Sequence, residues 1–386
     1  MESNTGLVFD LGSLYARFQE LHDQRKPKGK RYSLATVLVI LCLAKLCGED
    51  RPSGIAEWAQ QRREWIVKAL GLKRTSLPNH NTYRRILAQG VQAEELEQLV
   101  QEHFKHCGEA GYQVVISMDG KVLRGTIDTD AQEGLWLLAA YLPGEGITLA
   151  QVAIESKQNE ISAAPRLLGS VDLRNKVVIG DALHTQRQIS IQIGKAGGHY
   201  LWTVKANQPQ LEEDLRLWFE PEPAPIPGMA YPAKDFRSAQ TVNKGHGRLE
   251  TRTLTTSSQL NDFLDWPFLQ QVFKLEREVL IRKSAHTRQA VVYGITSLSA
   301  EQAPPEKLLH MLRSYWGIEN TLHYRRDVTL LEDRTRFKQH SAAHCMASLN
   351  NLLLGMLAKS DHPFLPSARR FFDAHPLEAL HLLTLL

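Results

Sequence analysis

The chain has 386 residues, of which 43% are hydrophobic and 8% aromatic, and its formal net charge is +4. This composition can fill a core, allows two or three domains, and indicates a soluble globular protein. The four cysteines are scattered without a CxxC pair, which argues against a disulfide framework or a zinc site and favours a reducing cytoplasm. The longest apolar run, residues 34–47, is too short to cross a bilayer, so we expect a buried helix there and no membrane partner.

Positive charge is concentrated near the N-terminus. The first 90 residues hold 15 Lys and Arg against 8 Asp and Glu, and residues 24–31 alone hold five positive charges. Residues 77–87 place Pro and Asn turn signals before a helix start that carries Arg84 and Arg85. A turn that leads into a basic helix is typical of a helix-turn-helix, although such charge runs are more often solvated surface. We predict a helical DNA-binding domain over residues 1–110, with Arg84 and Arg85 as DNA contacts.

From about residue 111 the hydrophobic pattern changes to alternating strands and helices. The expected order is strands at 112–120, 135–143 and 148–156, a helix at 160–171, a strand at 175–182, a helix at 185–197, a strand at 199–207 and a helix at 209–219. Three strands, helix, strand, helix, strand is the order of a ribonuclease-H-like α/β fold. We therefore predict that residues 111–219 form the first part of such a domain.

Two of these expected strands end in a carboxylate after an apolar run. Asp119 follows "VVISM" and Asp181 follows "KVVIG". Either residue alone is more readily explained as a turn or N-cap residue. If the strands are neighbours, however, both carboxylates meet at one sheet edge, where they repel each other unless a cation lies between them. Hard oxygen ligands suit Mg²⁺, which takes further ligands from substrate phosphates, so the pair indicates a phosphoryl-transfer site.

Successive motifs along most of the chain resemble those of the ISAs1 family of DDE transposases, which includes the H-repeat-associated proteins. They are "MDGKVLRG" (118–125), "ESKQNEISAAPRLL" (155–168), "VVIGDALHTQ" (177–186), "GGHYLWTVKANQPQL" (197–211), "HGRLETR" (246–252) and "RSYWGIENTLHYRRDVTLLED" (313–333). The segments "RPSGIAEWAQ" (51–60) and "LPNHNTYRRIL" (77–87) are similar to that family's associated N-terminal domain.

This resemblance implies a third acid, Glu319, to complete a triad with Asp119 and Asp181 that holds two Mg²⁺ ions, with Mn²⁺ as a substitute. Pro residues at 304 and 305 and helical spacing after them predict one long helix over 304–328 that carries Glu319. The implied activity is cleavage at the ends of an insertion sequence and strand transfer into target DNA. The implied partners are terminal inverted repeats, target DNA and further copies of the chain, as a homodimer or higher oligomer, in a bacterial, nucleoid-associated location.

Residues 220–290 are expected to form a β-rich insertion, because the gap between Asp181 and Glu319 far exceeds one strand and one helix. The rest of the catalytic domain is expected at 291–360, and a helical tail at 361–386. Basic and polar side chains that could hold phosphates are Lys121, Arg124, Lys205, Asn207, Lys244, His246, Arg248 and Arg252. The insertion's charges fit a solvated hairpin edge equally well.

Three further residues are expected to lie behind the acids and orient them: His184, His323 and Asp327. His184 could also hold a phosphate near the metals and is as readily a helix cap. The helix spacing leaves Asp327 free to orient Glu319 or to pair with Arg326.

Two other functions fit parts of the sequence. A metal-dependent nuclease on the same fold would need the same acids but would cut DNA without joining it. A domesticated, non-catalytic DNA-binding protein would keep the basic N-terminal region and need no metal, and the complete acid set argues against it.

Overall fold

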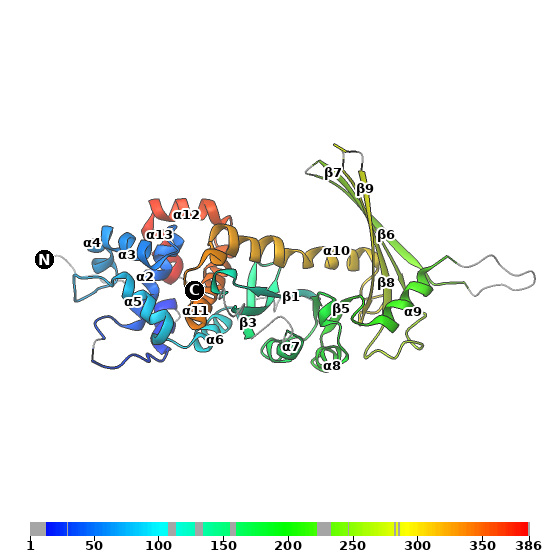
Figure 1. Cartoon of the computed structure of the whole chain (residues 1–386), viewed down its shortest axis with the longest axis horizontal. Coiled ribbons are helices and arrows are strands. Elements are labelled where there is room, and N and C mark those ends of the chain that lie inside the picture. The colour runs from blue at the N-terminus through cyan, green and yellow to red at the C-terminus, as the bar shows by residue number, and fades with distance from the viewer. Residues whose placement is uncertain are drawn as a thin grey trace, which may run out of the picture.

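The structure is a computed structural model that describes residues 13–28, 30–106, 113–127, 134–154, 160–221, 233–245, 247–281, 283–284 and 286–384. The molecule is elongated, with a cluster of helices at one end, a sheet through its middle, and long strands that rise from the other end (Figure 1). Within the described part of the chain, no helix is both long and apolar enough to cross a membrane.

The N-terminal part is helical, as predicted. Its elements are α1 (Leu14–Glu20), α2 (Leu34–Leu46), α3 (Pro52–Gln61), α4 (Arg63–Ala69), α5 (His80–Arg85), the π-helical turn η1 (Ile86–Gly90) and α6 (Ala93–His103). Every residue of α2 is buried, which confirms the helix expected from the apolar run. The helix α5 begins where the turn signals predict, because the Asn79 side chain accepts a hydrogen bond from the Thr82 N–H.

The central sheet has the ribonuclease-H-like strand order. Its strands are β1 (Val114–Val122), β2 (Trp136–Leu142), β3 (Ile147–Ile154), β4 (Lys176–Gly180) and β5 (His199–Val204), in the spatial order β3-β2-β1-β4-β5. β2 runs antiparallel to β1 and β3, whereas β1, β4 and β5 are parallel. The three parallel strands therefore bring their carboxyl ends to one edge.

Helices cover both faces of the sheet, and strand alternation determines which side chains meet them. The helices α7 (Glu160–Gly169), α8 (Arg187–Lys195) and α9 (Pro209–Phe219) share a core with Ile116, Met118 and Val178. The opposite face presents Val177 and Ile179 to α10 (Pro305–Tyr315). Because side chains alternate along a strand, Asp119 lies on the α10 side of β1.

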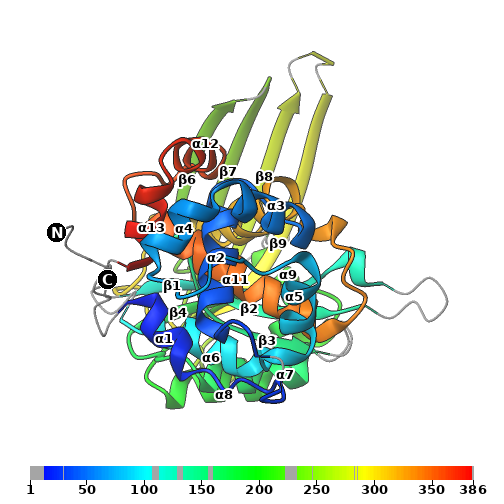
Figure 2. The same ribbon diagram turned by 90° about the vertical axis from the view of Figure 1, so that its left-hand side faces the viewer.

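The insertion is β-rich, as expected, but it is part of the same sheet. Its strands β6 (Arg237–Gly245), β7 (Arg248–Ser257), β8 (Gln271–Ile281) and β9 (His286–Thr296) are all antiparallel, and β9 pairs with β5. The full order is β3-β2-β1-β4-β5-β9-β8-β7-β6. Pairing with β9 covers the edge that β5 would otherwise expose. The hairpins project well beyond the helical layers (Figure 2).

The C-terminal helices return to the N-terminal end of the molecule. α11 (His340–Ala358), α12 (Leu365–Ala374) and α13 (Pro376–Thr384) share one hydrophobic core with α2, α3 and α6. Figure 2 shows α11, α12 and α13 among the N-terminal helices. The helical N-terminal part is therefore continuous with the layer that supports the sheet, and the domain limits given above remain a prediction.

The single long helix expected over 304–328 is not what the structure shows. α10 ends at Tyr315, and the chain continues through two π-helical segments, η5 (Ile318–His323) and η6 (Arg325–Thr329). π-Helical turns pair residues five apart rather than four, so a face drawn at 3.6 residues per turn no longer applies there.

A buried polar network joins α6, β3 and α11. The Glu97 carboxylate accepts hydrogen bonds from the Ser348 hydroxyl and from Gln151 Nε2, the latter at 3.2 Å. His344 Nε2 lies 3.8 Å away from it. Burial raises the pKa of Glu97 to about 7, although its two hydrogen bonds and Arg326 oppose the shift.

This raised pKa predicts a pH-dependent stability that Glu97→Gln removes. The folded state holds the Glu97 proton up to about pH 7 and the unfolded chain only to about 4.5, so this stabilising contribution is full below pH 4.5 and lost as pH rises to 7. Glu97→Gln is therefore expected to unfold with a free energy on the order of 3 kcal/mol higher than the wild type at pH 8, and with no advantage at pH 4. Urea unfolding at both pH values measures this difference.

The matched control is Glu102→Gln, which removes an exposed carboxylate from the same helix. It is expected to leave stability nearly unchanged at both pH values. An equal gain in the two variants would contradict a role for burial at Glu97.

Candidate active site

Asp119 and Asp181 lie opposite each other on neighbouring parallel strands. The register of β1 and β4 aligns Met118 with Gly180, so the next residue on each strand is an aspartate. The backbone of Asp181 is still extended, with φ −68° and ψ 173°. Neighbouring strands are about 4.8 Å apart, so the two carboxylates share one short stretch of the sheet edge.

The two aspartates differ in how the backbone holds them. Asp119 lies inside β1, which continues to Val122, whereas the sequence placed it near a strand end. Asp181 follows β4 and caps the short turn η4 (Ala182–His184) by accepting a hydrogen bond from the Leu183 N–H at 3.0 Å. The N-cap role and a place at the candidate site are therefore combined in one residue.

Glu319 belongs to η5, immediately beyond α10, and its side chain is exposed. The best indicator of what surrounds it is Tyr315 at the end of α10. Burial raises the pKa of the Tyr315 hydroxyl far above its usual value. The nearby negative charges that add to this shift are those of Asp119, Asp181, Glu319 and Glu160. The three predicted acids therefore all lie near the half-buried Tyr315.

Two histidines contact the aspartates from within the protein. His323 Nε2 lies 3.2 Å from Asp119 Oδ2, so His323 orients Asp119 rather than Glu319. His184 is fully buried, with Nε2 3.5 Å from Glu160 Oε2 and 3.9 Å from Asp181 Oδ1. This position places His184 behind Asp181 and excludes it from contact with phosphates.

Glu160 is the site residue that the sequence reasoning missed. It begins α7, is only 2% exposed, and lies so close to β1 that a Cβ on Gly120 would collide with its carboxylate. Glycine at position 120 therefore makes room for a fourth carboxylate, on the α7 face of the sheet and opposite to the face of Asp119. The available signal was the Glu that begins an amphipathic helix within the "ESKQNEISAAPRLL" motif.

The sequence predicts that Lys121 contacts phosphates, but the structure buries its side chain. Its side chain is buried and pairs with Asp327, and its Nζ lies 3.6 Å from Asp333 and 3.8 Å from Glu332. Burial lowers the pKa of Lys121 to about 8, with Glu332 opposing the shift. Its charge is therefore neutralised inside the protein, and the ion pair ties β1 to η6.

Arg326 also departs from the expected arrangement, because it does not pair with Asp327. It is fully buried and donates to Glu332 Oε2 at 2.7 Å and to Gln151 Oε1 at 2.9 Å. Glu332 begins the short turn η7 (Glu332–Arg334) and also accepts from Asn350. Adjacent residues of a helix point in different directions, so Arg326 enters the core while Asp327, its neighbour in the sequence, faces Lys121.

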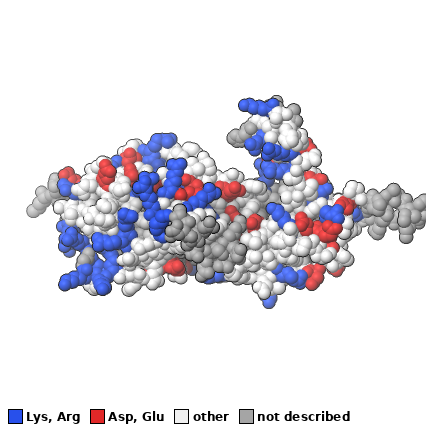
Figure 3. Space-filling model, viewed as in Figure 1, with Lys and Arg blue, Asp and Glu red and all other residues white. Residues whose placement is uncertain are grey.

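The remaining predicted DNA contacts divide into exposed and structural residues. The exposed cations are Arg84, Arg85, Arg124, Lys205, Lys244 and Arg248, whereas His246 lies outside the described residues. Asn207 donates to the Ala182 carbonyl and so supports the turn that carries Asp181. Arg252 is half-buried and pairs with Glu250 at 2.8 Å. Lys and Arg side chains are seen over the N-terminal helices and at the tips of the hairpins (Figure 3).

The donor set at this edge fits a hard divalent cation. The carboxylates of Asp119 and Asp181 are 27% and 42% exposed, which leaves open positions for water or a phosphate oxygen. Among the described residues, however, no group of three His, Cys, Asp or Glu side chains is close enough to surround one ion. Asp119 and Asp181 are therefore the pair that could share an ion in this arrangement.

Comparison with known proteins matches both parts of the chain. Residues 112–356 match the transposase DDE domain, and residues 15–104 match the DDE_Tnp_1-associated domain. A relative from Escherichia coli O157:H7, "Putative transposase YncI", is 28% identical over 89% of this chain and 87% of its own. "H repeat-associated putative transposase YhhI" of Escherichia coli K12 is 25% identical over 94% of each chain.

One solved structure covers 96% of this chain and 77% of its own, the piggyBac transposase synaptic complex with hairpin DNA. It is 9% identical, with a TM-score of 0.45.

Proposed function

The chain belongs to the transposase DDE domain family and is of the ISAs1, or H-repeat, type, and on that premise we propose that it cuts DNA at the ends of an insertion sequence and joins them to target DNA. The observation that carries the proposal is the register of β1 and β4, which aligns Asp119 with Asp181 at an open sheet edge. Glu319 from η5 is proposed as the third acid of this site.

The DDE transposase family uses divalent metal ions, and we propose two Mg²⁺ ions, replaceable by Mn²⁺, held by Asp119, Asp181 and Glu319. Bound there, the ions would polarise the attacking oxygen and stabilise the departing one. The chain itself holds the ligands: His323 fixes Asp119, and the turn supported by Asn207 fixes Asp181. The Lys121–Asp327 ion pair holds β1 against the helical segment that follows Glu319. No side chain is proposed to form a covalent bond to DNA.

DNA is the proposed partner, both as element ends and as target, bound by a homodimer or higher oligomer. Residues 1–110, including Arg84 and Arg85, are proposed to bind DNA, and the exposed Lys244 and Arg248 near the tip of the β6–β7 hairpin offer a second contact. Arg124 and Lys205 are proposed as phosphate contacts near the acids. Residues 111–219 and 291–360 then form the catalytic domain, interrupted by the insertion at 220–290.

A strand-transfer assay tests the function directly. The full chain is incubated with Mg²⁺, labelled duplexes that end in the inverted repeats flanking its gene, and a supercoiled target plasmid. Labelled plasmid is the expected product. Cut ends without joined product would instead support a nuclease on the same fold, and binding without cutting would support a non-catalytic DNA-binding protein.

A further inference from the structure

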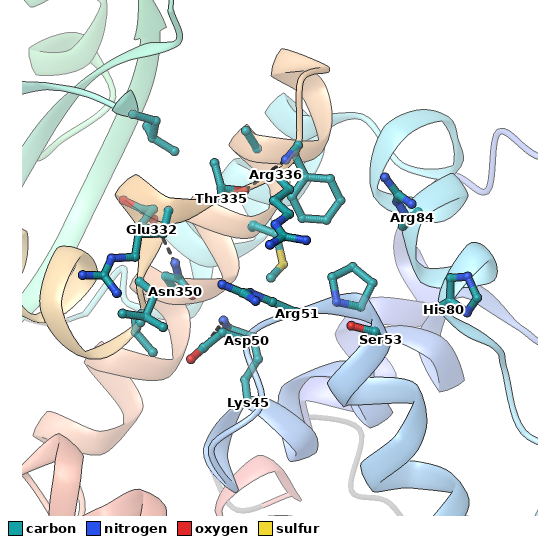
Figure 4. Close-up of a pocket in the computed structure, with 18 residues that line it drawn as sticks. Lys45, Asp50, Arg51, Ser53, His80, Arg84, Glu332, Thr335, Arg336 and Asn350 are labelled. Atoms are coloured by element: carbon teal, nitrogen blue, oxygen red, sulfur yellow. Dashed lines mark hydrogen bonds and ion pairs between the residues drawn. The ribbon is translucent and has the colours of Figure 1, made fainter. Parts of the chain in front are cut away.

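A cavity of about 270 Å³ lies where the N-terminal helices meet the segment that follows the acid-bearing π-helices. We call it the junction cleft. Four arginines line it: Arg51, Arg84 and Arg336, which Figure 4 labels, and Arg334. A second hollow adjoins it, shares Arg84 and Arg336, and adds Arg85 and Lys338. The cleft is thus lined by residues from the DDE_Tnp_1-associated part and from the DDE part of the chain.

The acids of the cleft wall already have cationic partners. Asp50 pairs with Lys45 at 3.0 Å and with Arg369 at 2.7 Å, and Glu332 pairs with the buried Arg326. By contrast, the four arginines of the cleft are exposed and form no ion pair with any carboxylate that the structure describes. The cleft therefore has an uncompensated positive charge.

Two of the arginines point toward the same space. Arg51 precedes Pro52 at the start of α3, and Arg336 follows η7, and in Figure 4 both guanidinium groups turn into the cavity between these elements. Like charges directed at one space repel each other unless an anion is present, and a guanidinium is well suited to a phosphate. The arrangement is complementary to a phosphodiester.

The segment that carries Arg334 and Arg336 is fixed against the residues that directly follow β1. The Arg124 N–H donates to Asp333 Oδ1 at 3.2 Å. Gly125 approaches Thr335 so closely that a Cβ there would lie 2.5 Å from the Thr335 carbonyl oxygen. The cleft is therefore positioned relative to the strand that holds Asp119.

The spacing along β1 relates the cleft to the candidate acids. Leu123, at the cleft wall, lies four residues beyond Asp119. Four residues of strand span about 13 Å, which corresponds to about four base-pair steps of duplex DNA. We propose that the junction cleft binds the phosphate backbone of DNA a few base pairs from the bond held at the acids. The two parts of one chain then grip the same duplex. This inference rests on the proposed function.

The test is DNA binding by the full chain in EDTA, which separates it from catalysis. Fluorescence anisotropy compares the wild type with the double variant Arg51→Ala/Arg336→Ala on an element-end duplex and on a duplex of unrelated sequence. The matched control is Arg174→Ala/Lys195→Ala, which removes two exposed charges at the opposite end of β4. The cleft variant is expected to bind both duplexes on the order of tenfold more weakly at 100 mM salt, and to lower the log–log salt slope by about 1.8.

A second arm locates the contact and excludes a free phosphate ligand. Single methylphosphonates, which remove one backbone charge, are placed at each of the first eight positions from the cleavage point. A substitution near the fourth position is expected to weaken the wild type but not the cleft variant. Titration with inorganic phosphate and with ATP is expected to displace DNA only at millimolar concentration.

Three results would overturn the inference. The first is equal DNA affinity for the cleft and control variants, and the second is that no methylphosphonate position weakens the wild type more than the cleft variant. The third is tight binding of ATP or phosphate that the cleft variant loses while its DNA binding stays unchanged. If the wild type binds neither duplex, the proposed function fails as well. That result is distinguishable from the other three, in which the wild type still binds.

Discussion

Asp119→Asn and Asp181→Asn are each expected to abolish end cleavage while DNA binding and folding persist. Asparagine keeps the shape of each side chain and, at position 181, the oxygen that caps η4, since Asn is as good an N-cap residue as Asp. What it removes is the charge that a divalent ion requires. A loss of about 4 kcal/mol in transition-state stabilisation corresponds to a rate reduction on the order of 10³-fold.

The measurement combines three readouts on the same protein: cleavage of a labelled end in Mg²⁺ and in Mn²⁺, affinity for that end in EDTA, and the melting temperature. Asp265→Asn is the control, because it removes a fully exposed carboxylate from a loop before β8. Cleavage at the wild-type rate by either site variant would end the proposal of a metal site at Asp119 and Asp181. Loss of cleavage together with a lowered melting temperature would instead assign the residue a structural role.

The sheet could be predicted because its signals are local. Short apolar runs such as those before Asp119 and Asp181 must be buried strands, and their order along the chain favours one topology. The pairing of β9 with β5 is different in kind, because it joins segments that are distant in the sequence. No local pattern distinguishes an insertion that forms its own domain from one that extends the sheet.

The roles of the charged residues around the site were harder to predict than the strands of the sheet. Lys121 directly follows an acid motif, and from the sequence alone its charge looks available for DNA. The structure pairs it with Asp327, about 200 positions later, which is a long-range contact that spacing cannot reveal. Arg326 likewise is buried only because Glu332 and Gln151 accept its hydrogen bonds. Whether a charged side chain can be buried depends on its ion-pair and hydrogen-bond partners. The tertiary fold determines which partners it meets.

The helical stretch from α10 to η6 was also only partly predictable from the sequence. Pro residues and apolar spacing correctly predict where the helix begins. The change to π-helical turns after Tyr315 has no signal in that spacing, yet it sets the position from which His323 contacts Asp119. π-Helical turns are frequent at functional sites, which agrees with their location here.

The π-helical segments η5 and η6 carry two candidates for the third acid, Glu319 and Asp327. Glu319→Gln is expected to abolish cleavage, whereas Asp327→Asn is expected only to reduce it. The side chain of Glu319 is exposed and has no hydrogen bond or ion pair with any residue that the structure describes, so its charge is free to bind an ion. Asp327 is already paired with Lys121. Asp327→Asn should therefore cost on the order of 10 to 100-fold, as for a residue that orients a ligand.

Lys121 provides the control that identifies the mechanism of the Asp327 effect. If Asp327 acts by tying η6 to β1, Lys121→Gln should reduce cleavage by a similar factor, and the double variant should lose little more than either single variant, because both remove one ion pair. Glu319→Gln should abolish cleavage whether or not Lys121 is replaced, and should leave the melting temperature unchanged. Cleavage rates over a titration of Mn²⁺ decide the assignment. An inactive Asp327→Asn beside an active Glu319→Gln would transfer the role of third acid to Asp327.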